Sequence, residues 1–344
     1  MDWCAIHRAA AGRALLALLA ASFAVPKALA QEVDFYRGKT IEIVIGYPTG
    51  GSNDVYSRLL AQFMGEHIPG KPRLVPRNMP GAGSFVAANY VYTLAPKDGT
   101  VIAIAAPTLA LDERLGNPGA KYKTAEFAWI GRINALVNIV FTRKGIVSSI
   151  QEAMTREVTL AGTGAGSTVS IYPTVVNNVL GTKFKLVMGY QGSHQAMLAM
   201  ERGEVDGHST GWEAVKTAHP DWLRDGSIDI LAQFGLNRHL ELPDVPTAVE
   251  LAKSEQDRRV LAAIMNATEI GISYFSPPGS PLQRIETLRE AFAATVRDPG
   301  FLQHAERAKL GVAPISGADL QALVGEVGAL DDKLLQRVRS IYAN

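Results

Sequence analysis

Two glycine-rich loops contain residues whose types and spacing would bind an anion. The first, YPTGGSND, follows a β-branched run and precedes a helical pattern. Its paired glycines let a ligand approach the backbone, and the amides that follow would open a helix whose free N–H groups and dipole favour negative charge. An ordinary capped turn would use the same residues. The anion interpretation assigns ligand binding to Tyr47, Thr49, Gly50, Gly51, Ser52, Asn53 and Asp54.

The second loop, GTGAGST, follows a short apolar run at 158–161 and also precedes a helical pattern. It reads G-x-G-x-G rather than the dinucleotide-binding G-x-G-x-x-G, and no acidic residue ends the next predicted strand to hold a ribose. A small anion cradle is the better interpretation. Because both loops end strands, we expect them to face each other across a cleft. The second loop contributes Thr163, Gly164, Ala165, Gly166, Ser167 and Thr168.

A third motif, GHSTG at 207–211, matches the G-x-S-x-G nucleophile elbow of α/β-hydrolases, with Ser209 as the nucleophile. An elbow needs a buried strand directly before it, whereas residues 202–206 supply one apolar side chain, so a secreted serine hydrolase is kept only as an alternative. Trp212 would be either a core aromatic or a platform over a bound ring. The histidines show no H-x-x-x-H or H-E-x-x-H spacing, so we predict neither a metal site nor a cofactor: His67, His194, His208, His219 and His239.

The elements that would position these loops alternate in type. Strands are predicted at 40–47, 74–76, 101–106, 158–161, 184–190 and 228–234. Helices are predicted from Asp54, at 84–94 with Ser84 as the cap, from Ser167 or Ser170 to 180 with Pro173 favouring the later start, at 194–202, and in three patterns after Leu282. Extended segments at 129–142 and 271–281 would cross between two halves. The pattern is typical of two doubly wound α/β lobes joined by a hinge.

The chain has 344 residues, 34 Lys+Arg and 33 Asp+Glu, and its net charge of +1 and the lack of a basic stripe argue against nucleic-acid binding. Residues 1–30 have the features of a secretory signal peptide: Arg8 and Arg13, a mainly apolar stretch of twelve residues at 14–25, and Ala-Leu-Ala before Gln31. The single cysteine, Cys4, lies in this leader. We therefore expect cleavage near Ala30/Gln31 and a periplasmic protein without disulfides.

Eight short motifs resemble the periplasmic receptors of tripartite tricarboxylate transporters, the TctC or Bug family, in the family's order. They are YPTGGSND with Arg58, NMPGAG at 78–83, PKDG at 96–99, GAGS at 164–167, GYQG at 189–192, RGEVDG at 202–207, LPDVPT at 242–247 and PPGSP at 277–281. The resemblance implies a two-lobed Venus-flytrap fold, each lobe a doubly wound sheet with helices on both faces. It places 31–135 with 271–344 in lobe 1 and 136–270 in lobe 2.

The same resemblance implies a receptor, not an enzyme, that binds a small carboxylate such as a di- or tricarboxylate and delivers it to the membrane components of a tripartite transporter. An aromatic acid is a further candidate because of Trp212, and a monomer is the default expectation for such a shuttle. A receptor that presents its ligand to a signalling sensor is an alternative. Waters in similar receptors bridge the first loop to a ligand carboxylate. The family usually has histidine where this chain has Ser170. The remaining expected ligand contacts are Thr108, Tyr190, His208, Ser209 and Trp212.

Overall fold

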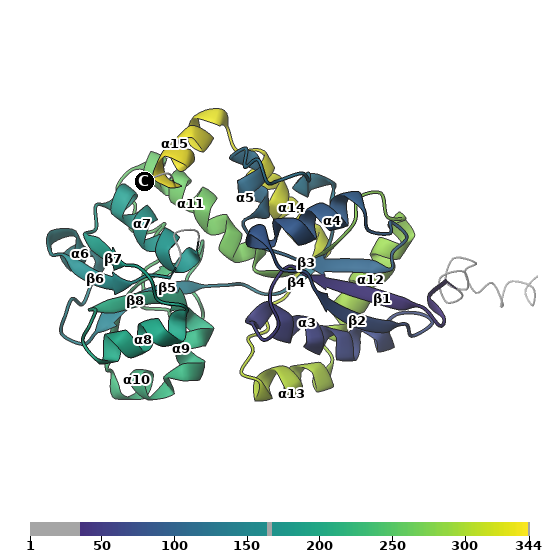
Figure 1. The fold of residues 1–344 in the computed structure, drawn as a ribbon, viewed down its shortest axis with the longest axis horizontal. Helices are drawn as coiled ribbons and strands as arrows, with labels where there is room; N and C mark the ends of the chain where they lie inside the picture. Colours follow the sequence, from purple (N-terminus) through teal and green to yellow (C-terminus); the bar gives the residue numbers. More distant parts are fainter. Residues whose placement is uncertain (1–34, 164–166, 343–344) are drawn as a thin grey trace, which may run out of the picture.

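The computed structural model describes residues 35–163 and 167–342, and these form two α/β lobes, each built on its own sheet (Figure 1). The predicted signal peptide and positions 164–166 lie outside the described residues. We call the six-stranded sheet with its helices lobe 1 and the five-stranded sheet with its helices lobe 2.

The sheet of lobe 1 has the order β11-β4-β10-β3-β1-β2. β1 pairs in parallel with β2 and β3, whereas β10 runs antiparallel to β3 and β4, and β11 runs antiparallel to β4. The sheet is therefore mixed. Its strands are β1 Thr40–Ile45, β2 Arg73–Asn78, β3 Val101–Ile104, β4 Ala128–Asn134, β10 Ile272–Ser276 and β11 Ile315–Ser316.

The sheet of lobe 2 has the order β7-β6-β8-β5-β9 and is also mixed. β6 pairs in parallel with β7 and β8, and β5 runs antiparallel to both β8 and β9. The predictions for β6 and β9 are confirmed to the residue. The strands are β5 Asn138–Arg143, β6 Val158–Ala161, β7 Phe184–Val187, β8 Gly207–Gly211 and β9 Ile228–Phe234.

Helices cover both faces of each sheet. In lobe 1, α3, α12 and α13 bury one face around the isoleucines of β1, and α4, α5 and α14 cover the other. In lobe 2, α7 covers one face, and α8, α9 and α10 the opposite one. The helices are α3 Ser52–Phe63, α4 Phe85–Thr93, α5 Leu109–Arg114, α6 Ile150–Thr155, α7 Thr168–Leu180, α8 Ser193–Glu201, α9 Trp212–Ala218, α10 Pro220–Asp225, α11 Glu255–Ile270, α12 Leu282–Thr295, α13 Pro299–Arg307, α14 Gly317–Gly328 and α15 Asp332–Tyr342.

Two segments carry the chain between the two sheets, and the connection from α14 to α15 crosses once more near the C-terminus. The first joins β4 to β5, and the second leads from α11 into β10 through Gly271. They touch: the Leu136 N–H donates to the Thr268 carbonyl at 2.9 Å, and a Cβ on Gly271 would lie 2.3 Å from the Asn134 carbonyl oxygen. Gly271 also has a φ of +52°, so glycine is required at this crossing on two grounds.

Several predictions about elements are wrong. α11 was not predicted, and four helices rather than three follow β10. Of the two predicted starts of α7, the earlier is confirmed, with Ser167 as the N-cap, and the later one favoured by Pro173 is wrong. Pro173 lies inside the helix, where its missing N–H removes one backbone hydrogen bond. β7 stops at Val187 because Gly189, with a φ of +113°, turns the chain. Ser84 does not cap α4 through its side chain. Its φ is +75°, and its hydroxyl donates to the Gly46 carbonyl at 2.9 Å.

Candidate functional site

The first loop, Tyr47–Asp54, connects the carboxyl end of β1 to the N-terminus of α3. Gly51 is the N-cap in an extended conformation (φ −77°, ψ 166°), and no side chain caps the helix. The loop presents Thr49, Gly50, Gly51 and Ser52 to solvent, whereas Asn53 and Asp54 are buried. The local sequence thus leaves an uncapped helix N-terminus at the sheet edge, which is the arrangement that favours an anion.

Asp54 fixes the shape of the first loop. Its carboxylate accepts hydrogen bonds from the Gly50 N–H, the Arg58 Nε and the Asn78 Nδ2, each at 2.9 Å. The hydrogen bond from Arg58 is the main reason that the pKa of Asp54 is lowered to about 2. Asn78 also donates to the Tyr47 carbonyl at 3.0 Å. The negative charge of Asp54 is therefore compensated inside the protein, and the carboxylate positions the loop.

Tyr47 and Ser84 connect this loop to the turn that precedes α4. Burial raises the pKa of Tyr47 to about 12, against the effect of a hydrogen bond with the Ser84 side chain. A Cβ on Gly46 would lie 2.8 Å from the Ser84 Cβ and Oγ, so the strand end and the NMPGAGS turn pack without spare room. Thr108 stands at the same edge, at the start of α5 after the parallel strand β3, and bonds to Asp112, whose pKa is raised by burial.

The second loop follows β6 in lobe 2. The Thr163 and Ser167 hydroxyls lie 2.7 Å apart, and Ser167 is the extended N-cap of α7 without a side-chain cap. Gly164, Ala165 and Gly166 lie outside the described residues. Tyr190 approaches from the neighbouring segment, where its N–H donates to the Gly162 carbonyl at 3.3 Å. The structure therefore brings Thr163, Ser167, Thr168 and Tyr190 to one edge of the lobe 2 sheet.

Residues 207–211, the GHSTG motif, form the strand β8 and not the turn that a nucleophile elbow requires. His208 and Ser209 are fully buried in mid-strand, where they pair with Phe141 and Val140 of β5. An elbow nucleophile must be exposed at a strand-to-helix turn, so the hydrolase alternative with Ser209 is wrong. His208 Nδ1 lies 2.9 Å from the Ala161 carbonyl oxygen, and burial lowers the pKa of His208 to about 4.

Trp212, the first residue of α9, has a packing role. Its side chain is 6% exposed within the apolar cluster of α8, α9 and α10, and its indole N–H donates to Glu241 at 2.6 Å. These contacts favour the core interpretation over the platform. The sequence reasoning missed the group around it: Glu213, His239 and Glu241 place ligand atoms within 4.8 Å of one another. Lys216 already forms an ion pair with both carboxylates of this group, with its Nζ 3.0 Å from Glu213 and 2.6 Å from Glu241.

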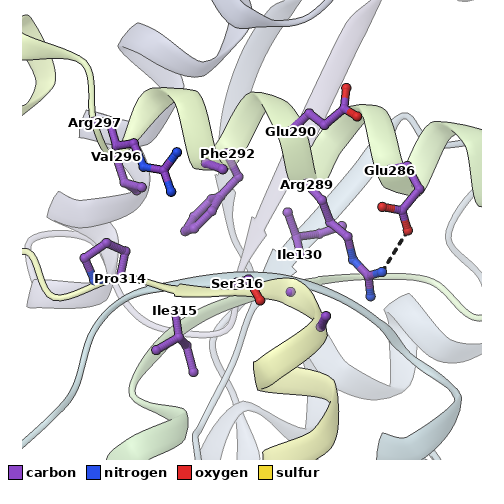
Figure 2. A pocket seen from close by; sticks show the side chains of 13 residues that line it. Ile130, Glu286, Arg289, Glu290, Phe292, Val296, Arg297, Pro314, Ile315 and Ser316 are labelled. Carbon is purple, nitrogen blue, oxygen red and sulfur yellow. Dashed lines mark hydrogen bonds and ion pairs between the residues drawn. The ribbon is translucent and has the colours of Figure 1, made fainter.

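A groove of about 290 Å³ lies elsewhere on lobe 1, between α12 and the β11–α14 connection (Figure 2). Phe292 points into it from α12. Its polar residues serve the fold: Arg289 donates to the Trp129 carbonyl and pairs with Glu286, both at 2.9 Å, and the Ser316 hydroxyl caps α14. The expected ligand residues do not line this groove.

Two mixed α/β sheets, joined by two crossing segments and each ending in a glycine-rich loop before a helix, define the two-lobed periplasmic-binding-protein fold. A family model described as the tripartite tricarboxylate transporter family receptor, TctC, matches residues 57–339, and the chain belongs to this family of solute-binding receptors. Among the described residues, no helix has the length and apolar character to span a membrane.

Relatives and solved structures agree with this assignment. The chain is 25% identical over 285 residues to the UPF0065 protein in the gbd 5′ region of Cupriavidus necator, covering 78% of each chain. It is 25% identical over 231 residues to protein BugT of Bordetella pertussis, covering 64% of this chain and 68% of BugT.

A ligand-free TctC solute-binding protein from Polaromonas aligns with a TM-score of 0.67 and 21% identity, over 90% of this chain and 99% of the other. A Rhodopseudomonas palustris protein, Rpa4515, solved with adipate, aligns with a TM-score of 0.61 and 22% identity, over 89% of this chain and 98% of that one. MatC of the same organism, solved with malate, aligns with a TM-score of 0.58 and 20% identity, over 89% and 99% of the two chains.

Proposed function

We propose that the protein binds a small organic di- or tricarboxylate between its first and second loops and delivers it to the membrane components of a tripartite transporter. The observation that carries this proposal is the first loop, in which the uncapped N-terminus of α3 is exposed to solvent. The one carboxylate of this loop, that of Asp54, is hydrogen-bonded to Arg58 and Asn78. The adipate and malate in two structures of the same fold support this ligand class.

We propose that the ligand contacts come from both lobes. Lobe 1 contributes the amides and hydroxyls of the first loop, with Tyr47 and Thr108 beside them. Lobe 2 contributes Thr163, Ser167, Thr168 and Tyr190, with Gly164, Ala165 and Gly166 between them in the chain. The burial of Trp212 supports an aliphatic acid over an aromatic one, because the indole ring is covered by its own lobe. A signalling sensor as the partner remains the alternative, and it would share the ligand.

The chain would act as a monomer in the periplasm after cleavage near Ala30/Gln31. We propose lobe bounds of 31–135 with 271–344 for lobe 1 and 136–270 for lobe 2, with α15 reaching across to lobe 2. That α15 extends to lobe 2 is supported by its packing on α7, where the Asn178 Nδ2 donates to the Ile341 carbonyl at 3.2 Å.

A thermal-shift screen tests the proposal. The melting temperature of the mature protein from Gln31 is measured separately with malate, adipate, citrate, benzoate and glucose. Each compound is present at about a hundred times a Kd in the micromolar range. A ligand that binds only the folded state stabilises it by about 2.7 kcal/mol when its concentration is a hundred times its Kd. We expect an aliphatic acid to raise the Tm and glucose to leave it unchanged.

Matched serine variants locate the site. Ser52→Ala in the first loop and Ser167→Ala in the second should reduce the shift caused by the acid. Ser148→Ala is the control, because Ser148 follows β5 at the opposite edge of the lobe 2 sheet, where it bonds to Glu152. Equal shifts in all three variants, or no shift with any carboxylate, would contradict the proposal.

A further inference from the structure

The N-terminus of α9 in lobe 2 contacts a turn of lobe 1 that the ligand loops do not include. This turn, residues 308–314, joins α13 to β11. A Cβ built on Gly311 would lie 2.6 Å from the Asn134 Nδ2 and 3.0 Å from the Glu213 Oε1. The distance to Asn134 is shorter than Cβ contacts in proteins, and the distance to the Glu213 carboxylate is tighter than most of them, so Gly311 is seated closely between Asn134 of lobe 1 and Glu213 of lobe 2.

The lobe 1 side of this contact is rigid. Leu310 and Val312 pack against the apolar core that α3, α12 and α13 form with the sheet. The Tyr56 hydroxyl donates to the Gly311 carbonyl at 2.8 Å, and the Ala313 N–H donates to the Ile133 carbonyl at 2.8 Å. Tyr56 and Asn134 are buried. The turn therefore moves with lobe 1.

The lobe 2 side is held by a chain of charged groups. Lys216, one turn after Glu213 on α9, lies 3.0 Å from the Glu213 carboxylate and 2.6 Å from that of Glu241. The Trp212 indole N–H donates to the same Glu241, and its ring lies 5.7 Å from the Lys216 Nζ. The ion pair with Lys216 favours the position of the Glu213 side chain beside Gly311.

The contact also lies beside the first crossing segment. Asn134 is the last residue of β4, immediately before the chain leaves lobe 1, and the Trp212 N–H donates to the Val137 carbonyl at 2.9 Å. In Figure 1, α9 lies on the side of lobe 2 that faces α3 and the chain rising from α13. A rotation of the lobes about the crossing segments would thus change the distance between Glu213 and Gly311 directly.

We propose that Glu213 and the Gly311 turn form an interlobe latch, a contact that favours the lobe arrangement described here over rotated ones. The latch acts next to the hinge and apart from both glycine-rich loops, so it sets the balance of lobe arrangements before any ligand binds. It is independent of the identity of the ligand and of the transport partner.

The distance between the lobes in ligand-free protein tests the latch. Spin labels are attached to Asp221→Cys on α10 and Gln303→Cys on α13, two exposed positions, one in each lobe, on helices drawn along the same edge of Figure 1. The mature sequence from Gln31 contains no other cysteine. Glu213→Ala removes the carboxylate, and Gly311→Ala inserts a methyl group into the contact. We expect each variant to change the relative populations in the interlobe distance distribution about twofold to fivefold, the range of a solvent-accessible polar contact.

Two further variants complete the experiment. Gly325→Ala is the control, because a Cβ on this α14 residue meets open space and should leave the distribution unchanged. The double variant Glu213→Ala/Gly311→Ala should show less than the sum of the two single effects, as expected for residues in contact. The proposal is overturned if Glu213→Ala gives the wild-type distribution at an unchanged Tm, or if the two substitutions act additively. Glu213→Ala removes a partly exposed side chain, so this arm does not depend on whether Gly311→Ala folds.

Discussion

Asp54 couples the first loop to the rest of lobe 1 through one carboxylate and three donors. Asp54→Asn would keep the size of the side chain but lose the charge-assisted bond to Arg58, and we expect it to lower the free energy of unfolding by about 1–2 kcal/mol at pH 7. Because the pKa of Asp54 falls from 3.8 to about 2 on folding, this stabilisation is fully present above about pH 4 and is lost as the pH falls through 2.

Urea unfolding at pH 7 and at pH 2 measures the effect of Asp54→Asn. The difference between the variant and the wild type should shrink at the lower pH. Asp244→Asn, at an exposed position, is the control and should cost little at either pH. A variant as stable as the wild type at pH 7 would show that Asp54 does not brace the loop.

His208 supplies a second pH dependence, at a milder pH. Burial lowers its pKa from 6.5 to about 4, so the unfolded chain binds a proton between these values and the folded chain does not. Stability should therefore fall on acidification from pH 6.5 to 4, by at most about 3 kcal/mol from this residue. His208→Gln should flatten the stability profile in this window, whereas His194→Gln, at an exposed position, should leave it unchanged. Identical profiles for wild type and His208→Gln would contradict the assignment.

Among the elements, α15 depends most on distant parts of the chain. It buries Leu334, Leu335, Val338 and Ile341 against α7 and α11, while the Arg339 guanidinium donates to the Leu115 carbonyl of lobe 1 at 2.9 Å. Deleting residues 332–344 would expose the apolar surfaces of α7 and α11. At roughly 1.5–3 kcal/mol for each buried aliphatic side chain, as an upper bound, the loss should amount to several kcal/mol.

Differential scanning calorimetry of the truncated protein would measure this loss as a Tm lower by roughly 10 °C or more, given about 2–4 °C per kcal/mol for a domain of this size. Lys333→Ala changes an exposed residue of the same helix and serves as the control. An unchanged Tm after truncation would show that α15 does not contribute to the stability of lobe 2.

At the scale of the whole molecule, the two ligand loops belong to separate lobes that are joined by two touching crossing segments and by the helices α11 and α15. Binding between the lobes would favour arrangements in which both loops contact the ligand, because only those gain its full binding energy. The acid that raises the Tm should therefore also narrow the interlobe distance distribution. Small-angle scattering would then give a smaller radius of gyration with ligand than without it. Binding that leaves both measurements unchanged would contradict capture between the lobes.

The two loops, the alternation of strands and helices, and the motifs of the TctC family can all be read from the amino-acid sequence. β6 and β9 were predicted to the residue because each is a short apolar run with clear local ends, and the first loop because Gly-Gly before a helical pattern is a local signal. The order of strands and the antiparallel pairing of β5, β10 and β11 have no such signal.

Features that depend on residues far apart in the chain became visible only in the packed molecule. GHSTG is polar and rich in glycine, yet it forms the buried strand β8 because β5 and β6 pair with it on both sides and Ser193 of α8 lies 2.8 Å from its Thr210 hydroxyl. Serine is a common helix-capping residue, but the Ser84 hydroxyl donates its hydrogen bond to the carbonyl of Gly46, which is distant in the sequence. Gly311 and Glu213 are almost a hundred positions apart and meet only through the arrangement of the lobes. Local patterns specify hydrogen bonding and burial along one element, whereas contacts between elements depend on how all of them pack together.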